Sequence, residues 1–333
     1  MEDRYSAGVV AAALAAALAG CAAGPDPGPV VPELSLEVAA AEGPGIPVLG
    51  TDSTLDIGTW NLEWFGDPSN GPSPEDRQLA NVTSVIDATG IDLWAVQEVG
   101  QVYQFDALVS DLFRYDGLLA TDPEVVDGAA YYSDFGGNEL KVGLVYRAGA
   151  ITVDSARVIL TPYDYEFAGR PPLQVHLTVG DDGAATPLVV IVLHAKAGAE
   201  PEDRDRRADG AAALKAFLDA RYPDAPVLVI GDFNDDVDAS IADGYPSPYA
   251  DFVDAAGYAF PTAALSAAGE TSMVYYPDVI DHQLTTDELV DQRGGQERIA
   301  GQDQVPEMVN PGHYIHTEPG IKDVEEVPAL PNF

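Results

Sequence analysis

The sequence is poor in cysteine, in long apolar runs and in basic residues. Each shortage argues against a kind of structure or of binding partner. Cysteine occurs once among 333 residues, as Cys21, so the chain cannot form an internal disulfide. No apolar run after residue 25 reaches the roughly 20 residues that a membrane-spanning helix needs. Lysine and arginine number 16 against 55 acidic residues, which gives a net charge of −39. Such a surface repels polyanions and slows encounter with bare nucleic acid unless salt or cations intervene.

What is present suits a globular protein. A hydrophobic content of 46% can build a core, and the length fits one large α/β domain with a tail or two small domains. The acidic residues are spread along the chain, and no repeat period is visible. Adaptation to a salty or cation-rich medium therefore explains the charge at least as well as a functional role does.

The first 21 residues have the pattern of an export signal. Ala7–Gly20 is an unbroken run of small and apolar residues that is too short to span a membrane and suits a signal-peptide core. It ends in Leu18-Ala-Gly-Cys21, which resembles the lipobox of bacterial lipoproteins, whose cysteine becomes the lipidated first residue. The resemblance implies attachment at the outer membrane or cell surface. The start of the chain, Met-Glu-Asp-Arg, carries two acidic residues and so departs from the lipoprotein pattern. The alternatives are an uncleaved anchor and an ordinary signal peptide that is cut nearby.

Residues 22–50 are rich in proline and glycine. A segment of this composition cannot bury a core, so we interpret it as a semi-extended tether. It would join Cys21 to a domain over residues 51–333. The prolines are Pro25, Pro27, Pro29, Pro32, Pro44 and Pro47.

The stretch Val227-Leu-Val-Ile-Gly-Asp-Phe-Asn-Asp-Asp236 joins a predicted strand to polar side chains. Its apolar start, rich in β-branched residues, predicts a strand buried on both faces. Asp232 and Asn234 follow at the C-terminal end, where α/β proteins commonly place their chemistry. The carboxylate can accept a proton or bind a hard cation, and the carboxamide can bind a phosphoryl oxygen without adding charge. A solvated turn is the alternative for this fragment taken alone.

Hydrophobic periodicity predicts the order strand, helix, strand, then several strands, then strand, helix, strand. Ser73 is typical of a helix cap with proline in the first turn, and Gly90 of a helix end. The last helix is expected to bury Ala212, Leu214, Phe217 and Leu218. This mixed order favours two packed sheets with helices outside. The expected strands are 55–66, 91–96, 141–147, 151–159, 173–179, 188–193 and 227–230, and the expected helices are 73–90, 105–113 and 201–221.

Four motifs stand in order along the chain. They are Thr59-Trp-Asn-Leu-Glu-Trp-Phe-Gly66, Val96-Gln-Glu-Val99, Val192-Leu-His-Ala-Lys-Ala-Gly198 and Ile230-Gly-Asp-Phe-Asn234. The set resembles the endonuclease/exonuclease/phosphatase superfamily of deoxyribonuclease I-like metal-dependent phosphoesterases. The resemblance implies an α/β fold, a four-layered α/β sandwich of two packed mixed sheets flanked by helices. It also implies a divalent cation, with Mg²⁺ expected and Mn²⁺ or Ca²⁺ as alternatives.

The same resemblance implies a role for each matching residue in an in-line attack of water on phosphorus. Glu98 matches the main metal ligand, in keeping with the preference of hard cations for carboxylate oxygen. Asn61 matches the residue that supports the metal and phosphate site. Asp232 and Asn234 match the pair that orients the water and holds the scissile phosphate. His194 matches a histidine that binds or protonates phosphate oxygens, and a buried structural histidine is the alternative.

The general base is where the chain departs from the family. The family usually ends near Ser-Asp-His-x-Pro-Val, whose histidine is the base, and no such motif closes this chain. Asp281 resembles a carboxylate on an earlier strand that orients this histidine. In one alternative Asp281 and His282 themselves serve as the pair; in a second the tail has lost the motif and the enzyme is damaged. In a third, His313 or His316 substitutes, and in each case Asp281 is expected in the site.

The sequence therefore predicts a secreted, lipid-anchored, metal-dependent phosphodiester hydrolase, above all a nuclease acting on DNA or RNA. Lys196 and Arg207 offer positive charge for the phosphate, although a solvated helix face explains Arg207 equally well. Because the net charge of −39 weighs against nucleic acid, a phosphatase or a sphingomyelinase-like phospholipase is the enzyme alternative. A catalytically impaired binding protein on the same fold is the other. The N-terminal lipid implies membrane contact, and no protein partner is inferred.

Overall fold

The computed structural model describes residues 46, 48–51, 54–132, 140–180, 185–273, 277–291, 307–309 and 313–317. They fall in one compact unit, Pro44–Phe333. The predicted signal segment and Cys21 lie outside the described residues. The last residues of the predicted tether belong to the folded unit, because the N–H groups of Leu49 and Gly50 both donate to Thr89 O at 2.8 Å. In the part of the chain that is described, none of the helices has the length and apolar character to cross a membrane.

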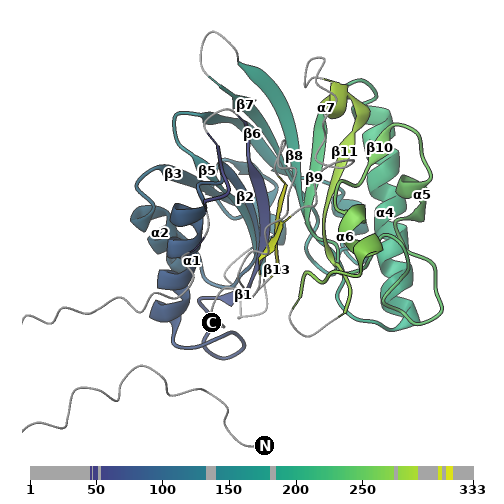
Figure 1. The fold of residues 1–333 in the computed structure, drawn as a ribbon, viewed down its shortest axis with the longest axis horizontal. Helices are drawn as coiled ribbons and strands as arrows, with labels where there is room; N and C mark the ends of the chain where they lie inside the picture. The colour runs from purple at the N-terminus through teal and green to yellow at the C-terminus, as the bar shows by residue number, and fades with distance from the viewer. Residues whose placement is uncertain are drawn as a thin grey trace, which may run out of the picture. The chain divides into compact units, whose positions relative to one another are not determined.

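Six strands form the first sheet, and two helices cover its outer face (Figure 1). In spatial order the strands are β12 (Glu307–Val309), β13 (His313–Thr317), β1 (Ile57–Phe65), β2 (Leu93–Val99), β5 (Lys141–Arg147) and β3 (Tyr115–Leu119). The helices are α1 (Glu75–Thr89) and α2 (Val102–Asp111). β1 runs parallel to β2 and antiparallel to β13. Apolar side chains of α1 and α2 share a buried cluster with those of β1 and β2.

Seven strands form the second sheet. In spatial order they are β10 (Tyr258–Ala259), β11 (Asp281–Thr286), β9 (Val227–Asp232), β8 (Thr186–His194), β7 (Leu173–Val179), β6 (Ile151–Val158) and β4 (Val125–Val126). β8 and β9 run parallel, and β11 is antiparallel to β9. The longest helix, α4 (Pro201–Arg221), lies on the outer face (Figure 1). The short helices are α3 (Gly128–Tyr131), α5 (Ala250–Val253), α6 (Ala263–Ala268) and α7 (Asp287–Asp291).

The two sheets pack face to face around a core to which both contribute. Leu93 of β2 and Leu144 of β5 share one buried cluster with Val175 of β7, Val190 of β8 and Ile230 of β9. β8 and β9 lie between the first sheet and α4, which is why their sequences are apolar on both faces. Helices, sheet, sheet and helices follow one another across Figure 1, so the predicted four-layered sandwich is confirmed.

Two local predictions about the helices are wrong. Helix α1 begins at Glu75 with Pro74 at the cap position and no side-chain cap hydrogen bond, so Ser73 does not cap it. Ala212 is exposed, whereas Leu214 and Leu218 are buried against the second sheet. Positions two apart on a helix point in nearly opposite directions, so burying the leucines turns this alanine to solvent.

Candidate metal and phosphoester site

The C-terminal ends of the two parallel strand pairs bring four predicted residues together. Asn61 comes from β1 and Glu98 from β2, while His194 and Asp232 close β8 and β9. Asn61 Nδ2 donates to Asp232 Oδ2 at 2.9 Å, a hydrogen bond that joins the two sheets. Parallel neighbours end at the same edge, which is why motifs far apart in the chain converge here.

The amide of Asn61 holds the two carboxylates next to each other. Its Nδ2 also donates to Glu98 Oε1 at 3.0 Å, and its Oδ1 accepts the N–H of Glu63 at 2.9 Å. The second oxygen of Glu98 accepts the N–H of Trp64 at 3.2 Å. Two carboxylates that share one neutral donor repel each other unless positive charge lies between them. This arrangement favours binding of a cation.

The donor set fits a divalent cation. His194 Nε2 lies 3.6 Å from Glu98 Oε1 and 3.7 Å from Asp232 Oδ2. One ligand atom from each of the three residues lies within 4.8 Å of the other two. The side chains of His194 and Asp232 are 1% and 2% exposed, while that of Glu98 is 16% exposed. A hard cation could use these carboxylate oxygens and keep its other positions open to water and phosphate.

The backbone around these residues is strained. Glu63, Trp64, Glu98 and Asn234 have φ values of 52°, 55°, 58° and 53°, in the left-handed region. The pairing of β1 with β2 also shifts its register between Asn61 and the end of the strand. Each such residue costs about 1–3 kcal/mol, and the strain persists where surrounding contacts impose it, as at binding and active sites. Packing at the strand ends thus fixes where these side chains point.

Hydrogen bonds lock the loop after β8 to the loop after β9. Asn234 N donates to Asp232 Oδ1 at 2.8 Å, so the carboxylate is held by its own loop. Asn234 Nδ2 donates to Ala195 O at 3.1 Å, and Ala195 N donates to Asp232 O at 2.9 Å. Asn234 is 8% exposed, directly beside the carboxylate pair. Asp232 and Asn234 thus lie together where β9 ends.

Asp281 lies beside Asp232 in the second sheet. It is fully buried and is the register partner of Asp232 in the antiparallel pairing of β11 with β9. Partners in such a pairing share one face of the sheet. His282, the next residue, is therefore on the opposite face.

The expectation that His282 joins Asp281 in the site is corrected by this alternation. His282 Nδ1 lies 2.8 Å from Thr262 Oγ1, and its Nε2 lies 2.9 Å from Val279 O. Its ring packs edge-on against Phe233 and Phe260. Burial lowers the pKa of His282 to about 4, so the ring is neutral at physiological pH. It is a structural histidine behind the second sheet.

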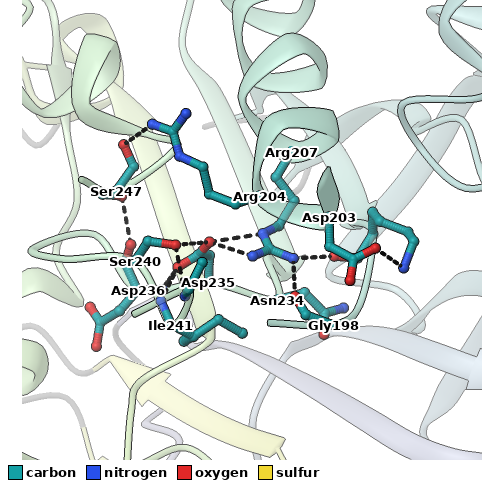
Figure 2. Close-up of polar contacts among 12 residues, drawn as sticks. Gly198, Asp203, Arg204, Arg207, Asn234, Asp235, Asp236, Ser240, Ile241 and Ser247 are labelled. Carbon is teal, nitrogen blue, oxygen red and sulfur yellow. Dashed lines mark hydrogen bonds and ion pairs between the residues drawn. The ribbon is translucent and has the colours of Figure 1, made fainter. Parts of the chain in front are cut away.

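Arg207 is neither a phosphate ligand nor part of a solvated helix face. It is fully buried, with Nε and Nη2 at 2.8 Å and 2.7 Å from Asp235 Oδ2. Its Nη1 donates to Lys196 O and Gly198 O, both at 2.7 Å (Figure 2). The guanidinium therefore ties α4 to the loops after β8 and β9. Lys196, the other expected phosphate contact, forms an ion pair with Asp203 at 2.6 Å.

This buried link predicts a large stability effect. Arg207→Met leaves Asp235 in the interior without its partner and should lower the free energy of unfolding by about 3–5 kcal/mol. The matched control is Lys215→Met on the same helix, which breaks a solvent-exposed pair with Asp219 and should cost less than about 1 kcal/mol. Urea unfolding of the full chain measures both. Equal losses in the two variants would show that Arg207 does not hold the loops.

Arg170 is a site residue that the sequence reasoning missed. It precedes Pro171 and β7, and its Nη2 donates to Ala195 O at 2.9 Å, the carbonyl that Asn234 also contacts. Burial lowers the pKa of its guanidinium, while the carboxylates of Glu98 and Asp232 oppose that shift. Arg170 is thus a positive charge within electrostatic reach of both carboxylates. The available signal was an arginine immediately before Pro-Pro at a strand start.

The sequence model of the Endonuclease/Exonuclease/phosphatase family matches residues 58–303, which include all four motifs. None of the curated proteins compared with the chain matches it.

Solved structures share the fold at low identity. D. rerio TDP2 in complex with a single-strand DNA product is 15% identical, covering 80% of this chain and 98% of its own, with a TM-score of 0.50. The human Nocturnin catalytic domain is 15% identical over 80% and 94% of the two chains, with a TM-score of 0.48. An endonuclease/exonuclease/phosphatase from Bacteroides vulgatus is 18% identical over 70% and 87%, with a TM-score of 0.49. The match to the family model, supported by the observed fold, shows that this chain belongs to the endonuclease/exonuclease/phosphatase family of hydrolytic phosphoesterases.

Proposed function

We propose that the chain is a divalent-cation-dependent phosphodiester hydrolase, and specifically a nuclease. The observation that carries the proposal is the pairing of Glu98 and Asp232 through one amide, with His194 within 4 Å of both carboxylates. DNA is the substrate class of first choice, because D. rerio TDP2 was solved with a single-strand DNA product. Cleavage of plasmid DNA with and without a chelator tests the proposal.

Glu98 and Asp232 are the residues that would hold the cation, and Mg²⁺ is the proposed ion. Both offer carboxylate oxygens, and the partly exposed side of Glu98 leaves room for water and phosphate. When bound, the cation supplies positive charge that stabilises the phosphoryl group as negative charge grows on it. Removing it with a chelator should therefore abolish hydrolysis.

The surrounding side chains are suited to phosphate oxygens and to the attacking water. His194 and the amide of Asn234 offer neutral or protonated donors beside the carboxylates, and Arg170 adds a fixed charge. Such donors, held in place before the reaction, stabilise developing charge without reorganising. Asp232 is proposed to orient the attacking water. Its two carboxylate oxygens are held by the amide of Asn61 and the N–H of Asn234.

We assign the general base to His313. The pairing of β13 with β1 places His313 opposite Asn61, the residue that joins the two carboxylates. His316 pairs with Gly58, three positions before Asn61 on β1 and farther from the strand end that carries the two carboxylates. Of the two candidate histidines in the tail, the register thus favours His313. Asp281, beside Asp232, is the carboxylate proposed to orient it.

A small or lipid-borne phosphoester is the second candidate substrate. The observation that favours it is the net charge of −39, which opposes the approach of a polyanion. A phosphatase or sphingomyelinase-like activity would escape this repulsion. Hydrolysis of such an ester by a chain that leaves plasmid DNA intact would favour this alternative.

We propose that the protein is held at the cell envelope by a lipid on Cys21. The lipobox-like sequence before this residue supports the proposal. Cys21→Ser should move the protein from the membrane fraction to the soluble fraction of a bacterial host, because no other cysteine can take the lipid. Ala22→Ser, which keeps the cysteine, is the control. Unchanged membrane retention of Cys21→Ser would refute lipidation.

A further inference from the structure

A groove of about 640 Å³ lies on the outer face of the second sheet, and none of its lining residues belongs to the site described above. Gln174 and His176 of β7 and Arg157 of β6 line it from the sheet. Phe217 and Arg221 of α4 line it from the helix, together with Tyr222, which follows that helix. We propose that this groove binds a small phosphomonoester that carries a planar ring, such as a nucleoside monophosphate.

The groove exists because one face of the sheet changes from apolar to polar. The pairing registers place Arg157, Gln174, Ile191 and Val229 side by side on that face. Ile191 and Val229 pack in the same buried cluster as the apolar side chains of α4. Gln174 and Arg157 line the groove from the polar part of this face. Phe217 and Arg221, near the C-terminal end of α4, line it from the helix.

Hydrogen bonds fix the floor of the groove. Gln174 is 2% exposed, and its Nε2 donates to Tyr222 Oη at 2.6 Å. Tyr222 Oη lies 3.1 Å from His176 Nε2. Because the hydroxyl accepts from the amide, its own proton is free to go to the imidazole, whose pKa is lowered by burial. A polar floor whose groups are held by hydrogen bonds, with Gln174 buried and His176 and Tyr222 half-buried, is typical of a binding site.

Two arginines line the groove without tight carboxylate partners. Arg157 lies 3.9 Å from Asp127, and both side chains are more than half exposed. Arg221 forms no ion pair with any residue in the described part of the chain. With 55 acidic residues against 16 basic ones, most arginines would be expected to find a carboxylate. Guanidinium groups that remain available match the oxygens of a phosphate group.

Aromatic side chains provide the place for the ring. Phe217 and Tyr222 meet edge to face with their centroids 6.0 Å apart, and the His176 ring lies 6.1 Å from that of Tyr222. Planar ligands bind to such surfaces by stacking or edge contacts. The volume of the groove falls within the range of small-molecule sites, roughly 300–1,000 Å³. The two arginines, the aromatic side chains and the volume of the groove together fit a phosphate group joined to a planar ring.

Calorimetric titration of the purified full chain with adenosine monophosphate tests the proposal, at low ionic strength and with a chelator that removes divalent cations. We expect one binding site, and Arg157→Ala and Arg221→Ala should each weaken binding about tenfold or more, since each removes charged donors. Arg77→Ala on α1, an equally exposed arginine outside the groove, should bind as the wild type does. Glu98→Gln should also bind normally, so the result is independent of the proposed hydrolase activity.

Any one of four results would overturn the proposal. Absence of binding would exclude the ligand class, and undiminished binding by both groove variants would place the ligand elsewhere. Loss of binding in Glu98→Gln would show that the nucleotide occupies the carboxylate site. Titration with adenosine and with inorganic phosphate separates the two halves of the ligand. Adenosine and inorganic phosphate should each bind more weakly than adenosine monophosphate. If either bound as tightly as the nucleotide, the groove would not recognise ring and phosphate together.

Discussion

Glu98→Gln should lower kcat/KM for metal-dependent hydrolysis of bis(nitrophenyl) phosphate about a thousandfold or more. Glutamine has the size of the native side chain but no charge, so it cannot replace the carboxylate as a ligand for a hard cation. Glu98 is also the most exposed of the three candidate ligands, which puts it where cation and phosphate would meet. The same variant should bind Mg²⁺ or Mn²⁺ much more weakly in a calorimetric titration.

Glu124→Gln is the matched control for this loss, because Glu124 is exposed and lies before β4, away from the carboxylate pair. It should keep full activity and metal affinity. If Glu98→Gln retained its activity, the cation would have to be held elsewhere. A fall in activity at unchanged metal affinity would assign Glu98 a role in substrate binding instead.

His313→Ala should reduce kcat by about two to four powers of ten, the usual contribution of a general base. The expectation rests on the pairing of His313, at the start of β13, with Asn61, whose amide contacts both carboxylates. Because a lost base affects the chemical step, KM should change little. The pH dependence of kcat/KM should also lose the limb that reports the base.

His316→Ala is the control from the same strand, since it removes a histidine whose register partner is Gly58. Activity should fall far less in this variant. If the two substitutions had equal small effects, β13 would not supply the base. Loss of activity in His316→Ala alone would reverse the assignment.

The layers and the convergence of the site could be predicted from the sequence because both follow from local patterns. Short unbroken apolar runs rich in β-branched residues, such as 188–193 and 227–230, are typical of strands buried on both faces, and both form such strands. Polar residues directly after such strands must then gather at one edge. This is why Asn61, Glu98 and Asp232, widely separated in the chain, meet within hydrogen-bonding distance.

What could not be predicted depends on contacts that no local pattern records. His282 follows an aspartate that lies beside the site, and only the pairing of β11 with β9 shows that this histidine is on the opposite face, in the aromatic cluster. Arg207 looked exposed because α4 carries many charges, but its partner Asp235 comes from another loop. The sequence also gives no sign that Glu98 adopts a left-handed backbone, because glycine is the residue expected in that conformation.

We propose that Glu98 and a divalent cation together drive phosphodiester cleavage, and nicking of plasmid DNA is the direct measurement of that role. The full chain and Glu98→Gln would be incubated with supercoiled DNA, each with Mg²⁺ or with a chelator. Nicked circles should form only where both the metal and the native glutamate are present. Nicking by Glu98→Gln, or in the chelator, would contradict the metal site, and intact plasmid in every reaction would contradict the assignment as a nuclease.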